Sequence, residues 1–98
     1  MSHWLQSQFS LAGKKALVTG ASKGIGASIA IAFAEAGADI VLVGRSQESL
    51  KSTRIAIEKI GRKVEELHCD VSSHDQISAA FSDVEKFKVD IVVNNAGT

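Results

Sequence analysis

Apolar residues in this chain form short runs separated by longer segments in which they recur about every 3.6 residues. The runs at 15–19, 40–43, 63–68 and 89–93 have the length of strands, although the third alternates only in part. The second run is wholly aliphatic, which favours a strand buried on both faces of a parallel sheet. Four strands separated by amphipathic segments are therefore predicted.

The first intervening segment predicts a helix that follows a glycine-rich turn at 20–26 and ends near Gly37. Its apolar residues recur at i, i+4, i+7, i+8 and i+11, which places them in one stripe. The members of this stripe are Ile25, Ile29, Ala32, Phe33 and Ala36. We expect the stripe to be the packed face of the helix.

Two further helices are predicted after the second and third strands. Ser46 can cap a helix in which Leu50, Ile57 and Ile60 share a face and which ends at Gly61. In the third helix, Ser73 and Gln76 have the spacing of a capping box. Its apolar positions are Ile77, Ala80, Phe81, Val84 and Phe87. The order of elements is βαβαβαβ.

Strict alternation of strands and helices predicts an α/β fold with a parallel sheet, because only right-handed crossovers pack each helix back onto the sheet. With the strand order 3-2-1-4, the chain would form just over half of a doubly wound, Rossmann-type fold. We expect residues 1–12 to be an N-terminal arm and residues 13–98 to be an incomplete dinucleotide-binding domain. Alone, such a part would expose an open strand edge and aggregate. Trp4 and Phe9 on the arm fit an apolar anchor better than a binding feature.

Charge and composition exclude several classes of partner. The chain has 11 basic and 11 acidic residues without blocks of like charge, so nothing favours nucleic acid or an anionic membrane. The aliphatic run at 40–43 is too short to span a bilayer, and the first twelve residues do not resemble a secretory signal, so we expect a cytoplasmic protein. Cys69 fits a buried, inert thiol better than a reactive one. The histidines His3, His68 and His74 lack metal-ligand spacing, so no metal is expected.

The glycine-rich turn is the first candidate for chemistry. Residues 19–26 read T-G-x-x-x-G-x-G between a strand and the start of a helix. Glycines there let the backbone approach a ligand closely, and the amides of the helix start attract a pyrophosphate. The spacing differs from the general G-x-G-x-x-G fingerprint. The alternative is a tight turn that is glycine-rich for structural reasons.

Two more motifs follow at the ends of later strands. Asn94 to Gly97 reads N-N-A-G after the fourth strand, and Asp70-Val71 follows the third. Together with the glycine turn, these motifs closely resemble those of the classical short-chain dehydrogenase/reductase family, over residues 11–98. The gluconate and deoxygluconate dehydrogenases and the 3-oxoacyl-thioester reductases are among the members that the chain resembles.

The resemblance implies a set of cofactor contacts. The residues that would line the pyrophosphate are Gly20, Gly24, Ile25 and Gly26, and those that would border a ribose are Asn94, Ala96 and Gly97. Asp70 would accept a hydrogen bond from the adenine amino group, and the amide of Val71 would approach the ring. On the residues alone, Asp70 is better explained as a solvated turn residue or a cap. Asn94 can also be structural, and for Asn95 a structural role is favoured. Thr19 also fits a structural role, because its hydroxyl can join adjacent backbone segments.

The family's catalytic residues are a tyrosine, a lysine four residues later and a nearby serine. The tyrosine exchanges a proton with the substrate oxygen, so its ordinary pKa of about 10 must be lowered. This chain contains no tyrosine. No catalytic residue can be named, and we expect the 98 residues alone to be inactive. The resemblance also implies a small-molecule substrate and a homo-oligomer, a dimer or tetramer, of the longer protein.

The end of the second strand predicts NADP(H) as the cofactor, with NAD(H) less favoured. NAD-binding sites usually place a carboxylate about 20 residues after the glycine turn, where it repels a 2′-phosphate. Here that position is Gly44, followed by Arg45, and Lys23 adds a second positive charge. Ser22 and Ser46 could donate neutral hydrogen bonds to the same phosphate. The alternative is that the two cations are solvated surface charges.

Three functions are therefore compared. The favoured one is an oxidoreductase that transfers a hydride between NADP(H) and an alcohol or carbonyl substrate, with the cofactor-binding half in this chain. The others are a nucleotide-sensing protein and a scaffold with the same fold and no catalysis. Within the enzyme reading, a sugar-acid or polyol dehydrogenase and a 3-oxoacyl-thioester reductase fit equally well.

Overall fold

The computed structural model describes residues 10–69 and 88–95, and its strands form one parallel sheet in the order β3-β2-β1-β4. The strands are β1 (Lys15–Thr19), β2 (Asp39–Gly44), β3 (Val64–His68) and β4 (Ile91–Val93), and the helices are α2 (Gly24–Glu35) and α3 (Gln47–Ile60). The predicted fold class and strand order are confirmed. The third predicted helix, with Ser73 and Gln76, lies outside the described residues, as do Trp4 and Phe9.

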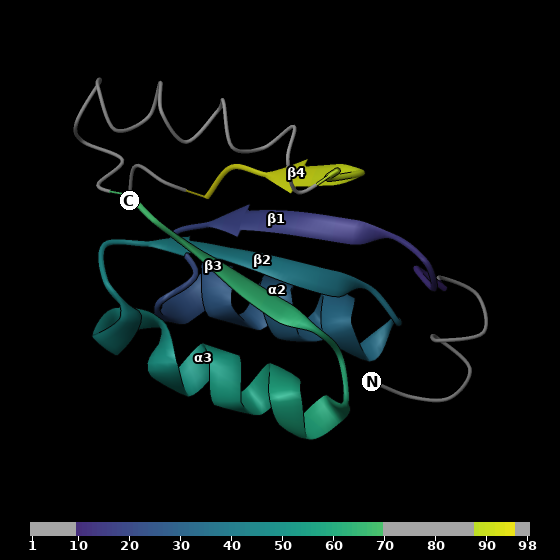
Figure 1. Cartoon of the computed structure of the whole chain (residues 1–98), viewed down its shortest axis with the longest axis horizontal. Helices are drawn as coiled ribbons and strands as arrows, with labels where there is room; N and C mark the ends of the chain where they lie inside the picture. Colours follow the sequence, from purple (N-terminus) through teal and green to yellow (C-terminus); the bar gives the residue numbers. More distant parts are fainter. Residues whose placement is uncertain (1–9, 70–87, 96–98) are drawn as a thin grey trace.

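Both described helices cover the same face of the sheet (Figure 1). The core on this side contains small residues of α2 and larger ones of α3 packed on β1 and β2. Its fully buried members include Ala16, Val18, Ala30, Ile40, Leu42, Leu50 and Ile57. On the other face, Leu17, Val41 and Val43 are also buried, as expected for strands with two apolar faces. Cys69 is buried beside them, which confirms its predicted burial.

The strands are aligned so that their carboxyl ends share one edge of the sheet. Thr19 pairs with Val43, and Gly44 pairs with His68 on the next strand. β1 also carries the loop into α2, and β2 carries the turn into α3. Because parallel α/β sheets bind ligands at this edge, the register brings the predicted motifs together.

The packed face of α2 differs from the predicted stripe. The buried residues of the helix are Gly26, Ala30 and Ala34, whereas Ile25 is 69% exposed. Of the predicted stripe, Phe33 packs against the core and Ala36 is buried just after the helix. Small residues at i, i+4 and i+8 let α2 lie close to the sheet, while Ile31 packs at the margin of the core and Ile25 is exposed. The prediction was wrong because it weighted side-chain size above closeness of approach.

Helix α3 follows its prediction at both ends. Ser46 caps it by accepting a hydrogen bond from the Ser49 amide at 3.2 Å, and Gly61 ends it with a φ of 95°. Its buried face is Leu50, Thr53 and Ile57, while Ile60 is 39% exposed, contrary to the prediction. Thr53 lies between Leu50 and Ile57 on this face.

Within residues 10–69 and 88–95, no helix is long and apolar enough to cross a membrane. In the same ranges, no three His, Cys, Asp or Glu side chains are grouped as metal ligands.

Candidate functional site

The loop between β1 and α2 depends on two glycines with a left-handed backbone. Gly20 has a φ of 62° and Gly24 has a φ of 64°. Residues with a Cβ adopt such angles only at a cost of about 1 kcal/mol or more. The glycines of the motif therefore fix a turn that other residues would strain, and the turn leads directly into the first residues of α2.

Close packing explains the glycine at Gly26. A Cβ at this position would lie 2.0 Å from the carbonyl oxygen of Gly20 and 2.8 Å from Nδ2 of Asn95. A Cβ at Gly20 would lie 2.9 Å from the carbonyl oxygen of Asn95. The start of α2, the loop and the segment after β4 thus touch backbone to backbone. The two motifs, far apart in the sequence, form one interlocked unit.

Thr19 joins the same two segments by hydrogen bonds. Its Oγ1 accepts from the backbone amide of Asn95 at 2.8 Å. The hydroxyl proton can be donated to the Val93 carbonyl at 3.3 Å or to Oδ1 of Asn94 at 3.2 Å. The structural roles predicted for Thr19 and Asn95 are confirmed, since both hold the end of β1 against the end of β4.

The amino terminus of α2 is open to an anion. Its N-cap residue, Lys23, is extended and makes no side-chain cap hydrogen bond, and the first turn contains no acidic residue. The first amides of a helix have no partner within the helix, and the helix dipole makes this end electropositive. A phosphate would accept hydrogen bonds from these amides, and its negative charge would be attracted to the electropositive helix end. Lys23 is exposed at this end, where its charge adds to the field.

The end of β2 is shaped by a contact that the sequence did not reveal. A Cβ on Gly44 would lie 2.6 Å from Cδ2 and 2.9 Å from Cγ of Leu50, which is fully buried in the core. The carbonyl of Gly44 accepts from the Cys69 amide at 2.7 Å. Glycine at position 44 therefore has two consequences. It leaves room for Leu50, and it places no carboxylate at the end of β2. Only the spacing of Gly44 and Leu50 across the helix cap could have suggested this contact.

The structure brings most of the predicted site residues to the carboxyl edge of the sheet. They come from the loop and start of α2, from the turn after β2 and from the end of β4. Those placed there are Gly20, Ser22, Lys23, Gly24, Ile25, Gly26, Arg45, Ser46 and Asn94. Arg45, Ser46 and Asn94 are exposed at this edge. The remaining predicted residues, Asp70, Val71, Ala96 and Gly97, lie outside the described ones.

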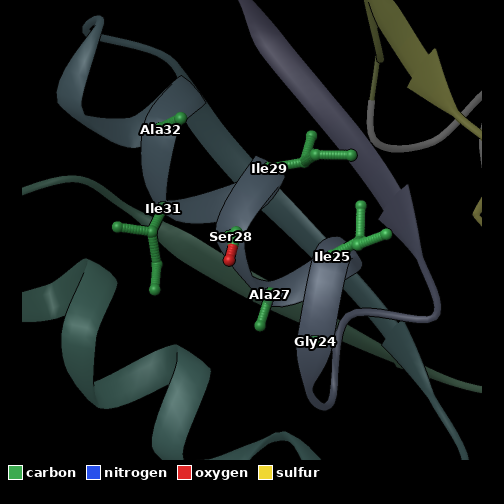
Figure 2. A pocket seen from close by; sticks show the side chains of 7 residues that line it. All are labelled: Gly24, Ile25, Ala27, Ser28, Ile29, Ile31 and Ala32. Atoms are coloured by element: carbon green, nitrogen blue, oxygen red, sulfur yellow. The ribbon is translucent and has the colours of Figure 1, made fainter.

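An open apolar hollow runs along the outer side of α2. Figure 2 shows Ile31 directed toward α3, whereas Ile25 and Ile29 point to the other side of the helix. The hollow is lined by Gly24, Ile25, Ala27, Ser28, Ile29, Ile31 and Ala32. Part of the predicted stripe therefore forms an exposed apolar surface. Only its first residues, Gly24 and Ile25, belong to the glycine motif.

Comparison with known proteins identifies the family. A family model described as short chain dehydrogenase matches residues 14–98. The chain belongs to this family. A 3beta-hydroxysteroid dehydrogenase of Mediterraneibacter gnavus is 47% identical over 83 residues, which are 83% of this chain and 30% of that protein. The gluconate 5-dehydrogenase of Gluconobacter oxydans is 42% identical over 99 residues, covering 99% of this chain and 38% of the relative.

Solved structures agree with this assignment. The crystal structure of a 3-oxoacyl (acyl-carrier-protein) reductase from Agrobacterium tumefaciens, with NADP bound, superposes with a TM-score of 0.87 at 38% identity. The match covers 96% of this chain and 37% of that one. The resemblance stated from the motifs is confirmed. This short-chain dehydrogenase chain spans about a third of the length of the relatives that it matches.

Proposed function

We propose that this chain is the N-terminal, cofactor-binding part of an oxidoreductase that transfers a hydride between NADP(H) and an alcohol or carbonyl substrate. The interlocked glycine loop carries the proposal. Gly26 permits α2 to begin in contact with Gly20 and Asn95, and the uncapped, acid-free helix start faces the same edge. An open anion site next to the strand ends is what a pyrophosphate requires.

The described residues at the start of α2 have the hydrogen-bond donors that the phosphates of a dinucleotide need. The amides at the start of α2 bind and orient a phosphate group, and the backbone contacts between the loop and Asn95 keep them in place. When bound, the nicotinamide supplies or accepts the hydride. Rigid positioning of its phosphates holds the reactive ring in a fixed place relative to the substrate. The proton-transfer residues of the family would lie in the longer protein.

Exposed apolar side chains support a longer parent protein. Ile25 is 69% exposed on α2, and Val92 is 55% exposed on β4. Ile25 would be covered by an element packed along the hollow of α2, and Val92, which is in register with Leu17, by an element on the opposite face of the sheet. Relatives such as the gluconate 5-dehydrogenase are about two and a half times as long as the match, consistent with such elements.

The preference for NADP(H) rests on the turn after β2. Gly44 provides no carboxylate to repel a 2′-phosphate, and Arg45 is exposed directly after it. Lys23 is exposed at the start of α2, on the same edge of the sheet. An Arg guanidinium binds a phosphate through two donors, which makes it a stronger ligand than a lone ammonium. The related reductase with NADP bound supports a cofactor of this class.

The test is a pair of affinities measured by titration calorimetry in the longer protein. NADPH should bind at least about tenfold more tightly than NADH, a difference of about 1.4 kcal/mol. A double variant, Gly44→Asp with Arg45→Ala, should narrow or invert this ratio by adding a repelling charge and removing an attracting one. Equal affinities in the unmodified protein would make NAD(H) the better assignment, and no binding of either would favour a scaffold.

Two controls separate charge from packing. Because any side chain at position 44 must displace Leu50, Gly44→Ala reports the steric effect alone and should weaken both cofactors equally. Lys63→Ala removes an exposed cation just before β3, at the opposite edge of the sheet, and should leave the ratio unchanged. A ratio that changes as much in Lys63→Ala as in the double variant would show a general effect of net charge and not a phosphate contact.

A further inference from the structure

Thr53 is a buried polar side chain among the apolar residues of α3. It is 3% exposed and lies between Leu50 and Ile57 on the face that packs toward the sheet. Its hydroxyl donates a hydrogen bond of 2.8 Å to the carbonyl oxygen of Ala21. A buried hydroxyl without a partner is costly, so this bond fixes both groups. It connects α3 to the glycine loop across 32 positions of the sequence.

Ala21 is the anchor of that loop. It is fully buried and follows Gly20, and three positions later the chain again adopts a left-handed conformation at Gly24. Its amide reaches the carbonyl of Val43 only at 3.5 Å, a long hydrogen bond. The bond from Thr53 is much shorter, so it is the stronger restraint on this residue. Figure 1 shows the starts of α2 and α3 at the same end of the sheet, which makes this contact possible.

The restraint also fixes the direction of the next amide. In a planar trans peptide, the carbonyl of one residue and the N–H of the following residue point in opposite directions. When Thr53 holds the Ala21 carbonyl toward α3, the Ser22 N–H must point away from α3. Without this bond, the peptide between Ala21 and Ser22 could rotate about the two soft dihedrals beside it, the ψ of Ala21 and the φ of Ser22.

From this geometry we infer that Thr53 is a positioning residue for cofactor binding, which acts through Ala21 to present the Ser22 amide to the phosphates. It touches no cofactor atom, because it is buried behind the loop. The inference rests on the proposed function, since it assumes that the loop binds a dinucleotide. Motif spacing does not reveal this role, because Thr53 belongs to no glycine or asparagine motif.

The experiment compares Thr53→Val, which keeps the shape and removes the hydroxyl, with Thr53→Ser, which keeps the hydroxyl. In the longer protein, NADPH should bind about tenfold more weakly to the Val variant, and within threefold of the unmodified value to the Ser variant. Adenosine, which lacks every phosphate, should bind equally well to all three proteins. Ser52→Ala removes an exposed hydroxyl from the neighbouring position of α3 and should change neither affinity.

Several outcomes would overturn the inference. Thr53→Val with NADPH affinity within twofold of the unmodified protein would remove any role for the hydroxyl. Equal weakening of NADPH and of adenosine would show a general loss of structure. If the Val variant does not fold, Thr53→Ala removes the same hydroxyl and is compared with Thr53→Ser in its place. Failure of the unmodified protein to bind either nicotinamide dinucleotide is a different result, which contradicts the proposed function itself.

Discussion

The two described helices begin in opposite ways, although both follow a strand at the same edge of the sheet. Helix α3 starts with a complete capping box, in which Ser46 and Ser49 satisfy each other's amides at 3.2 and 3.3 Å, and Glu48 lies in its first turn. Helix α2 has neither a side-chain cap nor an acidic residue at its start. A good cap stabilises a helix by about 1 kcal/mol. α3 takes this stabilisation from its own residues, whereas the start of α2 has no such cap, as the proposed phosphate site requires.

The two starts also differ in the range of their contacts. The cap of α3 is local, because its bonds join residues three positions apart. The loop before α2 is held from a distance by Asn95 and Thr53, through contacts with Gly20, Gly26 and Ala21. The cap of α3 can form as soon as the helix forms, because it uses only residues of the first turn. The start of α2 requires the whole sheet edge to be assembled, so its geometry depends on the tertiary structure.

The largest expected effect comes from Gly26→Ala. In a helix, replacing glycine by alanine normally adds about 1 kcal/mol to the free energy of unfolding. Here the new Cβ would lie 2.0 Å from the Gly20 carbonyl oxygen, so backbone atoms must move. We expect the steric cost to prevail, lowering the free energy of unfolding by about 3 kcal/mol. Denaturant unfolding of the longer protein measures this change, and NADPH affinity should fall with it.

Gly24→Ala is the matched control for Gly26→Ala. A Cβ at Gly24 meets no atom within 4 Å, but the backbone has a φ of 64°. The expected loss is therefore the cost of a left-handed alanine, about 1 kcal/mol. Equal losses in the two variants would mean that conformation, and not contact with Gly20, explains the glycines of the motif.

A smaller effect is expected from Thr19→Val. The exchange preserves shape but leaves the Asn95 amide without the hydroxyl oxygen that accepts its hydrogen bond at 2.8 Å. Losing the partner of a partly buried amide costs about 2 kcal/mol. We expect thermal and denaturant unfolding to show this loss, with Thr19→Ser close to the unmodified protein. A Val variant as stable as the unmodified one would show that glycine packing alone holds β1 to the end of β4.

The sequence was sufficient where the deciding interactions are local. Aliphatic runs located all four strands within two residues. Alternation with helices predicted a parallel sheet, and the order 3-2-1-4 was that of the doubly wound fold. Ser46 and Gly61 were recognised as helix ends because caps depend on residues a few positions apart. The glycine and asparagine motifs were placed at the correct edge of the sheet for the same reason, since each directly follows a strand.

Interactions between distant segments could not be predicted in the same way. The packed face of α2 was assigned to large residues, but Gly26, Ala30 and Ala34 make the contact because small side chains allow close approach. The repeat of small residues every four positions was the available signal. The steric need for glycine opposite Leu50 and the bond from Thr53 to Ala21 depend on how α3 lies against the loop. Those contacts are set by packing of the whole layer, which periodicity does not describe.

The smallest effect concerns Ser46, whose cap and predicted phosphate contact are compatible. As a cap, Ser46 uses a lone pair of Oγ to accept from the Ser49 amide, which leaves its hydroxyl proton available to a phosphate. Ser46→Ala should lower the free energy of unfolding by about 1 kcal/mol and weaken NADPH binding by about threefold. Ser49→Ala removes the reciprocal half of the capping box, so it should cost about 0.5 kcal/mol and leave the affinity unchanged. Calorimetric titration and denaturant unfolding of both variants separate the two roles. If NADPH binds Ser46→Ala as tightly as it binds Ser49→Ala, Ser46 is a cap only. The start of α3 would then contribute no contact to the phosphate, and only the start of α2 would be open to a ligand.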